Sequence, residues 1–174
     1  MSLQPAKLLV SVGEREVRLR IAGRANFTCG PDFKNLTTGL LEKGYRRFII
    51  EMSECVLMDS TFLGLLCGLA LRLKESGNGS AGVELLNANP RVAELLESLG
   101  VTEIITMGEA PVTAPDAPET AQVCCAEHSR SEMTQTSLDA HQTLRDLNPE
   151  NAARFKDVVQ FLAEDLKRLK SAGS

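Results

Sequence analysis

The sequence predicts an α/β fold, because strand-like and helix-like segments alternate from Leu8 to Thr106. Two apolar segments at the start of this region lie close enough in sequence to form a hairpin, and most later strands are separated by a helix. Strands of a hairpin pair antiparallel, whereas strands joined through a helix pair in parallel. We therefore expect a mixed sheet with helices packed against it.

The opening hairpin is the clearest predicted element. Its strands are expected at Leu8 to Val12 and Arg15 to Ala22, with Gly13-Glu14 as the turn and Gly23 as the end of the second strand. Apolar and charged side chains alternate along the second strand, so that one face meets a core and the other meets solvent. The apolar face comprises Val17, Leu19 and Ile21, and the opposite face comprises Glu16, Arg18 and Arg20.

The remaining elements follow from apolar periodicity and from glycine and proline at their ends. Helices are expected at Pro31 to Gly44, Thr61 to Glu75 and Arg91 to Leu99, and strands at Arg47 to Met52 and Val83 to Leu86. The run Phe48-Ile49-Ile50 is typical of a buried central strand. Thr102 to Thr106 is compatible with a last short strand or a turn.

The composition narrows the classes of function. The 174 residues carry a formal net charge of -4, with 4% aromatic residues and no Trp. Nucleic-acid-binding proteins concentrate positive charge and often stack bases on aromatic rings, so nucleic acid is not an expected partner. The acidic balance also argues against anionic membrane surfaces. Apolar runs are too short for a membrane span or a signal peptide, and we expect neither.

The cysteines favour a cytoplasmic protein. They are odd in number and scattered, as is typical of reduced thiols, at Cys29, Cys55, Cys67, Cys124 and Cys125. The group Cys124, Cys125 and His128 resembles part of a metal site, but no second ligand cluster completes four-coordination. We therefore expect no metal and no other cofactor.

A change in composition divides the chain into three parts. Residues 1–107 form the α/β domain, 108–128 a linker rich in Pro and Ala, and 129–174 a helical extension. The linker is expected to be extended and poorly ordered. In the extension, Ser129 to Leu147 can form one helix, and Asn148-Pro149-Glu150 begins another that runs to about Lys170.

The last helix carries a narrow apolar seam of coiled-coil type, with spacings of three and four residues. The seam comprises Ala152, Phe155, Val159, Leu162, Leu166 and Leu169. Two short helices bury little surface alone, so this seam needs a partner. The partner could be the α/β domain, the preceding helix in a local hairpin, or a second chain in a homo-oligomer.

The segment from Met58 to Leu73 is the most informative about function. An apolar run ends at Asp59-Ser60 and a largely apolar helix follows at once, so that Ser60 or Thr61 can cap it through a hydroxyl. Gly64 and Gly68 fall on one face, and helical Gly costs about 1 kcal/mol relative to Ala, which close approach of a neighbour would offset. A capped, buried helix common to any α/β domain explains this pattern without a function.

A sharper interpretation makes Ser60 a phosphorylation site. A phosphate there would place nearly two negative charges at a helix N-terminus, where free N–H groups and the helix dipole stabilise an anion. The same charge would change the electrostatic interaction with any partner docked on this surface. The functional change would then be electrostatic, with little change of shape.

The residues also resemble a known family. The strings FIIEMSECVLMDSTFLGLLCGLALRLKESG and VELLNANPRVAELLESLGVTEII are similar to the STAS domain of bacterial anti-sigma factor antagonists, over about Leu8 to Met107. The most specific parts are Asp59-Ser60 before Leu63-Gly64, and the run from Asn89 to Val92 before Leu99-Gly100. The resemblance implies a mixed sheet of four or five strands, with helices mainly on one side.

The resemblance also implies a function in transcription regulation. Such a protein binds an anti-sigma factor that is itself an ATP-dependent serine kinase, is phosphorylated at a serine corresponding to Ser60, and is reset by a serine phosphatase. Thr61 is the second choice of acceptor, because Thr61-Phe62 stands where relatives often have Ser-Gly. Asn26 replaces an acid that many antagonists carry. The implied partner-binding residues are Asn26, Asp59, Ser60, Thr61, Phe62 and Leu63.

Other functions need different features of the chain. A scaffold or assembly protein with this fold and no switch would act through its C-terminal helices. A STAS subunit associated with a transporter would act beside a membrane protein. No enzymatic activity is expected and no catalytic residue is assigned, because His128 and His141 lie in the part of the chain that follows the α/β domain, away from that domain.

Overall fold

The structure is a computed structural model and describes residues 6–76, 79, 81–112, 118–123 and 128–172. It is a mixed α/β fold with a C-terminal helical extension, as the sequence predicts. The strands are β1 (Lys7–Val12), β2 (Val17–Ala25), β3 (Arg47–Glu51), β4 (Cys55–Met58), β5 (Gly82–Leu86), β6 (Thr106–Gly108) and β7 (Glu119–Val123).

The sheet has the order β6-β5-β3-β2-β1-β7, and β4 pairs with β2 outside this path. The strands β1 and β2 form the expected antiparallel hairpin, and β7 adds an antiparallel strand on the other side of β1. The strands β2, β3, β5 and β6 run parallel to one another. The sheet therefore has more than the four or five strands expected, because β4, β6 and β7 join it.

The longest strand, β2, has two parallel neighbours in succession. Its first part pairs with β3 and its last part with β4, with a shift of register between Gly23 and Arg24. Gly23 has a φ of 93°, which glycine adopts without strain. The strand is thus bent at Gly23 and does not end there as expected. The bend places the end of β4 beside the end of β2.

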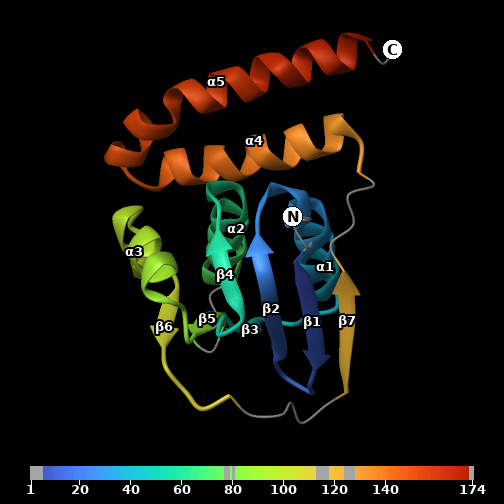
Figure 1. Cartoon of the computed structure of the whole chain (residues 1–174), viewed down its shortest axis with the longest axis vertical. Helices are drawn as coiled ribbons and strands as arrows, with labels where there is room; N and C mark the ends of the chain where they lie inside the picture. The colour runs from blue at the N-terminus through green and yellow to red at the C-terminus, as the bar shows by residue number, and fades with distance from the viewer. Residues whose placement is uncertain (1–5, 77–78, 80, 113–117, 124–127, 173–174) are drawn as a thin grey trace.

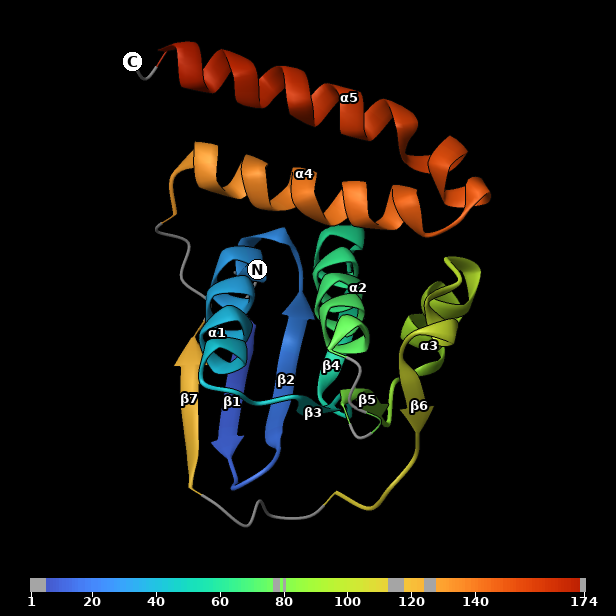
Figure 2. The same cartoon turned by 180° about the vertical axis from the view of Figure 1, so that it is seen from behind.

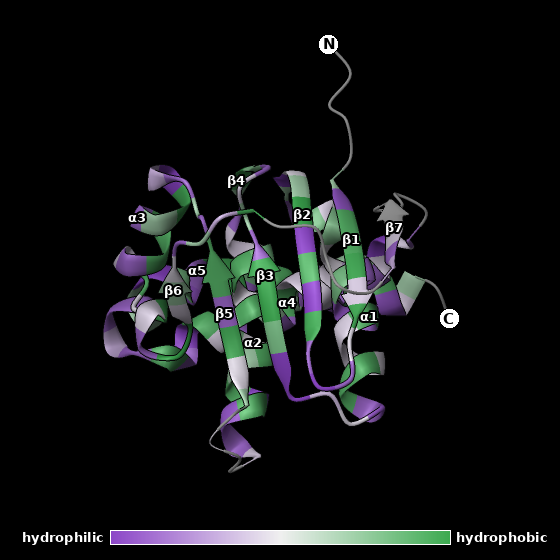
Figure 3. Ribbon diagram, turned by 90° about the horizontal axis from the view of Figure 1, so that it is seen from below, coloured by the Kyte–Doolittle hydropathy of each residue, from purple (hydrophilic) through white to green (hydrophobic). Residues whose placement is uncertain are grey.

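Two helices, α1 (Gly30–Glu42) and α2 (Ser60–Glu75), cover one face of the sheet (Figures 1 and 2). The smaller elements are η1 (Phe27–Cys29), α3 (Pro90–Ser98) and η2 (Val101–Glu103). The core between sheet and helices contains Phe33 and Phe62, whose ring centroids are 4.6 Å apart. Figure 3 shows apolar and polar residues alternating along β2, as expected for a strand with one covered face.

The C-terminal helices α4 (Arg130–Leu147) and α5 (Pro149–Ala172) form a hairpin that crosses one end of the α/β layers (Figure 1). We refer to α4 and α5 together as the C-terminal hairpin. Within it, α5 packs on α4 and buries Phe155, Val159 and Leu166 of the predicted seam. In turn, α4 packs on α2 and α1. The seam of α5 therefore forms the local hairpin, which was one of the expected arrangements, and α4 makes the main contact with the α/β domain. A homo-oligomer stays a prediction.

The range 108–128, expected to be an extended linker, contains β7. The C-terminal hairpin is therefore preceded by a strand of the sheet. In the described part of the chain, no helix is both long and apolar enough to cross a bilayer.

The cysteines differ in part from expectation. Cys55 and Cys67 are free and buried, whereas Cys29 is disulfide-bonded. The expectation of reduced thiols is therefore wrong for Cys29. Cys124 and Cys125 lie outside the described residues.

The packing predicts which phenylalanine is essential for stability. Replacing the fully buried Phe62 in Phe62→Ala should lower the free energy of unfolding by about 3–5 kcal/mol, because it leaves a cavity against Phe33. The matched change Phe27→Ala should alter it by about 0.5 kcal/mol or less, because Phe27 is 51% exposed. Denaturant unfolding measures both values. Equal losses in the two variants would contradict this description of the core.

Candidate functional site

The candidate site lies where β2 and β4 end and α2 begins. Asp59 is the N-cap of α2, and its Oδ1 accepts a hydrogen bond of 2.9 Å from the backbone N–H of Phe62. Its Oδ2 accepts one of 2.7 Å from the backbone N–H of Phe27, in the segment that follows β2. One carboxylate thus caps the helix and joins two segments that are far apart in sequence.

This arrangement corrects the expected capping. The sequence predicts that Ser60 or Thr61 caps α2, but Asp59 does so, and Ser60 is the first residue of the helix. The capping hydrogen bond to the Phe62 N–H is made by the Asp59 carboxylate and not by the Ser60 hydroxyl. The Ser60 hydroxyl is therefore available to groups outside its own helix.

Burial and hydrogen bonding have opposite effects on the pKa of the Asp59 carboxyl. Burial raises the pKa of this carboxyl above its usual value, and the N–H bonds from Phe62 and Phe27 limit the rise. A partly buried carboxylate at a helix N-terminus is favoured by the helix dipole. A second anion on Ser60 would lie beside this carboxylate and would compete with it for the same positive helix end.

The Ser60 hydroxyl contacts the C-terminal hairpin. Its Oγ lies 2.8 Å from His141 Nε2 on α4. His141 Nδ1 lies 2.7 Å from the backbone carbonyl oxygen of Ser137, which can only accept a hydrogen bond. Nδ1 therefore carries a proton, and in the neutral imidazole Nε2 accepts the hydrogen bond that Ser60 donates.

Two further contacts hold α4 on the start of α2. Thr61 Oγ1 lies 2.9 Å from Ser137 Oγ, and both hydroxyls can donate or accept. Gly64 meets the backbone of α4 at Ala140, where a Cβ on Gly64 would overlap with the Ala140 carbonyl oxygen. The close approach expected for Gly64 is thus present, whereas a Cβ on Gly68 would meet no atom within 4 Å.

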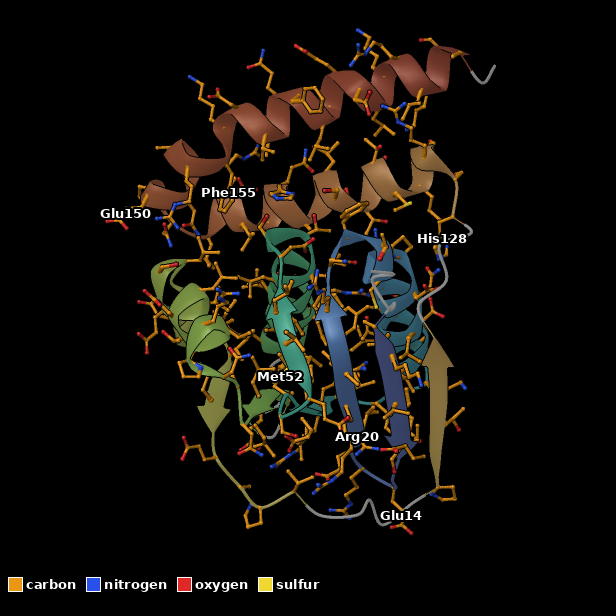
Figure 4. The ribbon with its side chains drawn as sticks, in the orientation of Figure 1. Glu14, Arg20, Met52, His128, Glu150 and Phe155 are labelled. Atoms are coloured by element: carbon orange, nitrogen blue, oxygen red, sulfur yellow. The ribbon has the colours of Figure 1, made fainter. Side chains whose placement is uncertain are left out.

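The expected isolation of the histidines from the domain is wrong in three dimensions. His141 is 5% exposed and reaches Ser60, and its ring also packs edge-on against Phe155 of α5, with centroids 5.6 Å apart. His128 Nε2 lies 3.0 Å from Asp32 Oδ1 on α1, and this hydrogen bond raises the His128 pKa. Figure 4 shows Phe155 between the two helices of the hairpin and His128 at the start of α4.

The comparisons with known proteins agree with this architecture. A family model described as "Mlab, STAS domain" matches residues 9–107, which is more than half of the chain. This chain belongs to the STAS domain family. A comparison with curated protein sequences gave no match.

Solved structures share the fold of this STAS domain. A proposed anti-sigma factor antagonist of Thermotoga maritima, TM1081, is 20% identical with a TM-score of 0.53, covering 58% of this chain and 85% of its own. The anti-sigma factor antagonist SpoIIAA in its unphosphorylated form is 21% identical with a TM-score of 0.50, covering 59% and 86%. At these identities the similarity shows a common fold. The C-terminal hairpin lies outside the residues that the family model matches.

The STAS domain places the predicted site residues in different environments. Asn26 is half-buried at the end of β2, where its side-chain oxygen accepts a 3.1 Å hydrogen bond from the Thr28 N–H and caps η1. Asp59 and Ser60 are half-buried, and Thr61 is 4% exposed. Phe62 and Leu63 are fully buried in the core, and the expected role of these six residues in partner binding stays a prediction.

The groups that the C-terminal hairpin brings to this site were not predicted from the sequence. Ser137, Ala140 and His141 follow a helical spacing on one face of α4, but nothing in their spacing names α2 as the neighbour. Phe27 was not singled out either, because its exposure and its backbone bond to Asp59 follow from the fold and cannot be read from the sequence. In the described part of the chain, no cluster of His, Cys, Asp or Glu is arranged to hold a metal ion.

The contact between Ser60 and His141 predicts energetic coupling. In a double-mutant cycle of Ser60→Ala and His141→Ala, the interaction energy in unfolding should be about 0.5–1.5 kcal/mol, as expected of one hydrogen bond. Chemical denaturation of the full chain and the three variants measures it. The pair Ser98→Ala and His141→Ala is a control that should be additive, because Ser98 bonds within its own helix α3. Additivity in both pairs would contradict the Ser60–His141 contact.

Proposed function

We propose that this STAS protein is an anti-sigma factor antagonist whose binding to an anti-sigma factor kinase is switched by phosphorylation of Ser60. The observation that carries the proposal is the position of Ser60. It begins α2 directly after a cap made by Asp59, so its hydroxyl is not needed to stabilise the helix. It also lies at the end of two parallel strands, the edge where open α/β sheets commonly bind ligands.

The chemistry of this position supports a phosphate-dependent switch. Phosphorylation would add three acceptor oxygens and nearly two negative charges at the first turn of α2. Backbone N–H groups and the helix dipole favour an anion there, so the modified domain would keep its fold. The nearby Asp59 carboxylate would add to the negative charge, so an interface formed with the unmodified surface would meet like charges.

An exposed surface adjoins this position and supports partner binding. Phe27 is 51% exposed, and its backbone is hydrogen-bonded to Asp59. Val56, on β4, is 58% exposed. These apolar side chains lie near the strand ends that carry Asn26 and Asp59, and apolar residues beside a polar centre are common in protein interfaces. We propose that a partner contacts Phe27 together with Asn26, Asp59 and Ser60.

A scaffold function without a switch is the second candidate. It is favoured by the outer side of α5, where Val158 is 37% exposed and Phe161 is 58% exposed. In this case the C-terminal hairpin would join copies or partners, and Ser60 would serve only as a contact to His141. The phosphorylation experiment described next separates the two candidates.

Incubation of the full chain with ATP and the purified anti-sigma factor kinase of the same genome should place one phosphate on Ser60, as read by peptide mass spectrometry. Thr61 is the second choice of acceptor, and Ser60→Ala should remove the signal. Ser60→Asp should weaken binding to this kinase at least about tenfold, whereas Ser60→Ala should still bind. Ser98→Asp is the matched control, because Ser98 is exposed on α3 and should tolerate the charge.

Absence of phosphate from both Ser60 and Thr61 after prolonged incubation would overturn the switch. Equal binding of Ser60→Asp and Ser98→Asp to the kinase would also contradict it. Either result would leave the scaffold function as the better account of the chain.

A further inference from the structure

In this structure α4 covers the start of α2, and we refer to the covered surface around Ser60, Gly64 and Gly30 as the groove. Around Ser60 and Gly64, the neighbours from α4 are Ser137, Ala140 and His141. Gly30 at the start of α1 also faces α4, since a Cβ there would lie 3.3 Å from Thr136 Cγ2. Small residues on both sides of the contact allow the helices to approach closely.

Occupation of this groove by α4 is incompatible with a phosphate on Ser60. The Ser60 Oγ and His141 Nε2 atoms are 2.8 Å apart, so a phosphoryl group cannot fit between them. The acceptor oxygen must also be approached by the γ-phosphate of ATP for transfer to occur. Approach to the Ser60 hydroxyl from the side that His141 occupies therefore requires that α4 first move away.

The contact between α4 and α2 is extensive and combines apolar with polar groups, and Leu138 and Leu144 of α4 are buried in the hydrophobic core. Ser137 and His141 of α4 form its hydrogen bonds. An ion pair between Lys34 and Asp139 adds a contact to α1, but both side chains are about two-fifths exposed, so it contributes little. The two hydrogen bonds and this ion pair are the polar part of the contact, and each contributes little by itself.

A second set of contacts anchors the turn of the hairpin elsewhere. The side-chain amides of Asn148 and Asn151 both donate to the carbonyl oxygen of Leu99, at 3.3 and 2.9 Å. These bonds satisfy a carbonyl at the C-terminal end of α3, and Asn151 is 1% exposed. The hairpin can therefore stay attached near α3 while α4 leaves α2.

We infer that the C-terminal hairpin is an autoinhibitory element, in which α4 occupies the partner-binding groove of its own STAS domain. The inference rests on the proposed function for what is inhibited: binding of the anti-sigma factor kinase and phosphorylation of Ser60. The closed form neither binds nor is phosphorylated, and the unaltered chain does both slowly, through the fraction of molecules that opens.

Gly64 offers a way to open the hairpin without altering Ser60. In Gly64→Ala, the new Cβ would overlap with the Ala140 carbonyl, and the three nearest atoms to it all belong to Ala140. Within α2 itself the change is favourable, because Ala is a better helix former than Gly. Gly68→Ala is the matched control, since it makes the same change one helical turn later with no atom within 4 Å.

The experiment measures access to position 60 directly, and needs no kinase. Ser60→Cys is combined with Gly64→Ala or with Gly68→Ala in the full chain, and alkylation by iodoacetamide is followed at residue 60 by peptide mass spectrometry. Alkylation should be at least about tenfold faster with Gly64→Ala than with Gly68→Ala. Ala140→Leu, which enlarges the α4 side of the same contact, should act like Gly64→Ala.

Two internal cysteines report on unfolding. Cys55 and Cys67 are buried, and burial raises their thiol pKa to about 11 and about 12, so both should stay unreactive in every variant. Equal alkylation rates at position 60 in the Gly64→Ala and Gly68→Ala chains would overturn the proposal. Reaction of Cys67 in the Gly64→Ala chain would overturn it too, because α2 would then need this glycine for its own packing.

Phosphorylation rates of the same two chains distinguish a failure of autoinhibition from a failure of the proposed kinase switch. The Gly64→Ala chain should be phosphorylated by the kinase at least about tenfold faster than the Gly68→Ala chain. Faster alkylation together with no phosphate in any chain contradicts the kinase switch but supports closure of the groove by α4. Faster alkylation with equal phosphorylation rates contradicts autoinhibition.

Discussion

The architecture of the functional end of this protein depends on one close approach between two backbones, at Gly64 on α2 and Ala140 on α4. Because no side chain separates the helices there, Ser137 and His141 come within hydrogen-bonding distance of Thr61 and Ser60. The bonds are weak individually, at about 1 kcal/mol each, so they depend on the backbone approach that aligns them. A larger residue at position 64 would remove the approach and both hydrogen bonds together.

The chemistry of Ser60 follows from how its neighbours are engaged. Asp59 caps α2 and ties the end of β2 to the helix start, which leaves the Ser60 hydroxyl free for intermolecular or hairpin contacts. The same hydroxyl can donate to His141 in the closed chain or accept a phosphate in an open one, but not both. A domain that would otherwise present a simple binding surface thereby acquires two mutually exclusive states, which is the requirement for a switch.

Local rules made the α/β domain predictable and left the hairpin's position undetermined. The alternation of Val17, Leu19 and Ile21 and the caps and glycines at helix ends are short-range signals, and they place the strands and helices within a few residues. The bend at Gly23 and the strand β7 were missed because both depend on pairing with distant segments. Ser60 was identified from its local pattern, whereas its contact with His141 joins residues 81 positions apart. The seam of α5 showed that the helix needed a neighbour but could not indicate which one.

The most direct test of this account is a proton–proton NOE in solution between the α-protons of Gly64 and the methyl group of Ala140. The position that a Cβ would take on Gly64 lies 2.8 Å from Ala140 Cβ, so a strong NOE is expected in the full chain. In Gly64→Ala the NOE from the α-proton of residue 64 to the Ala140 methyl group should be lost, while the NOEs between the Phe33 and Phe62 rings persist. Absence of the Gly64–Ala140 NOE in the unaltered protein would show that α4 does not occupy the groove, and would contradict the central claim.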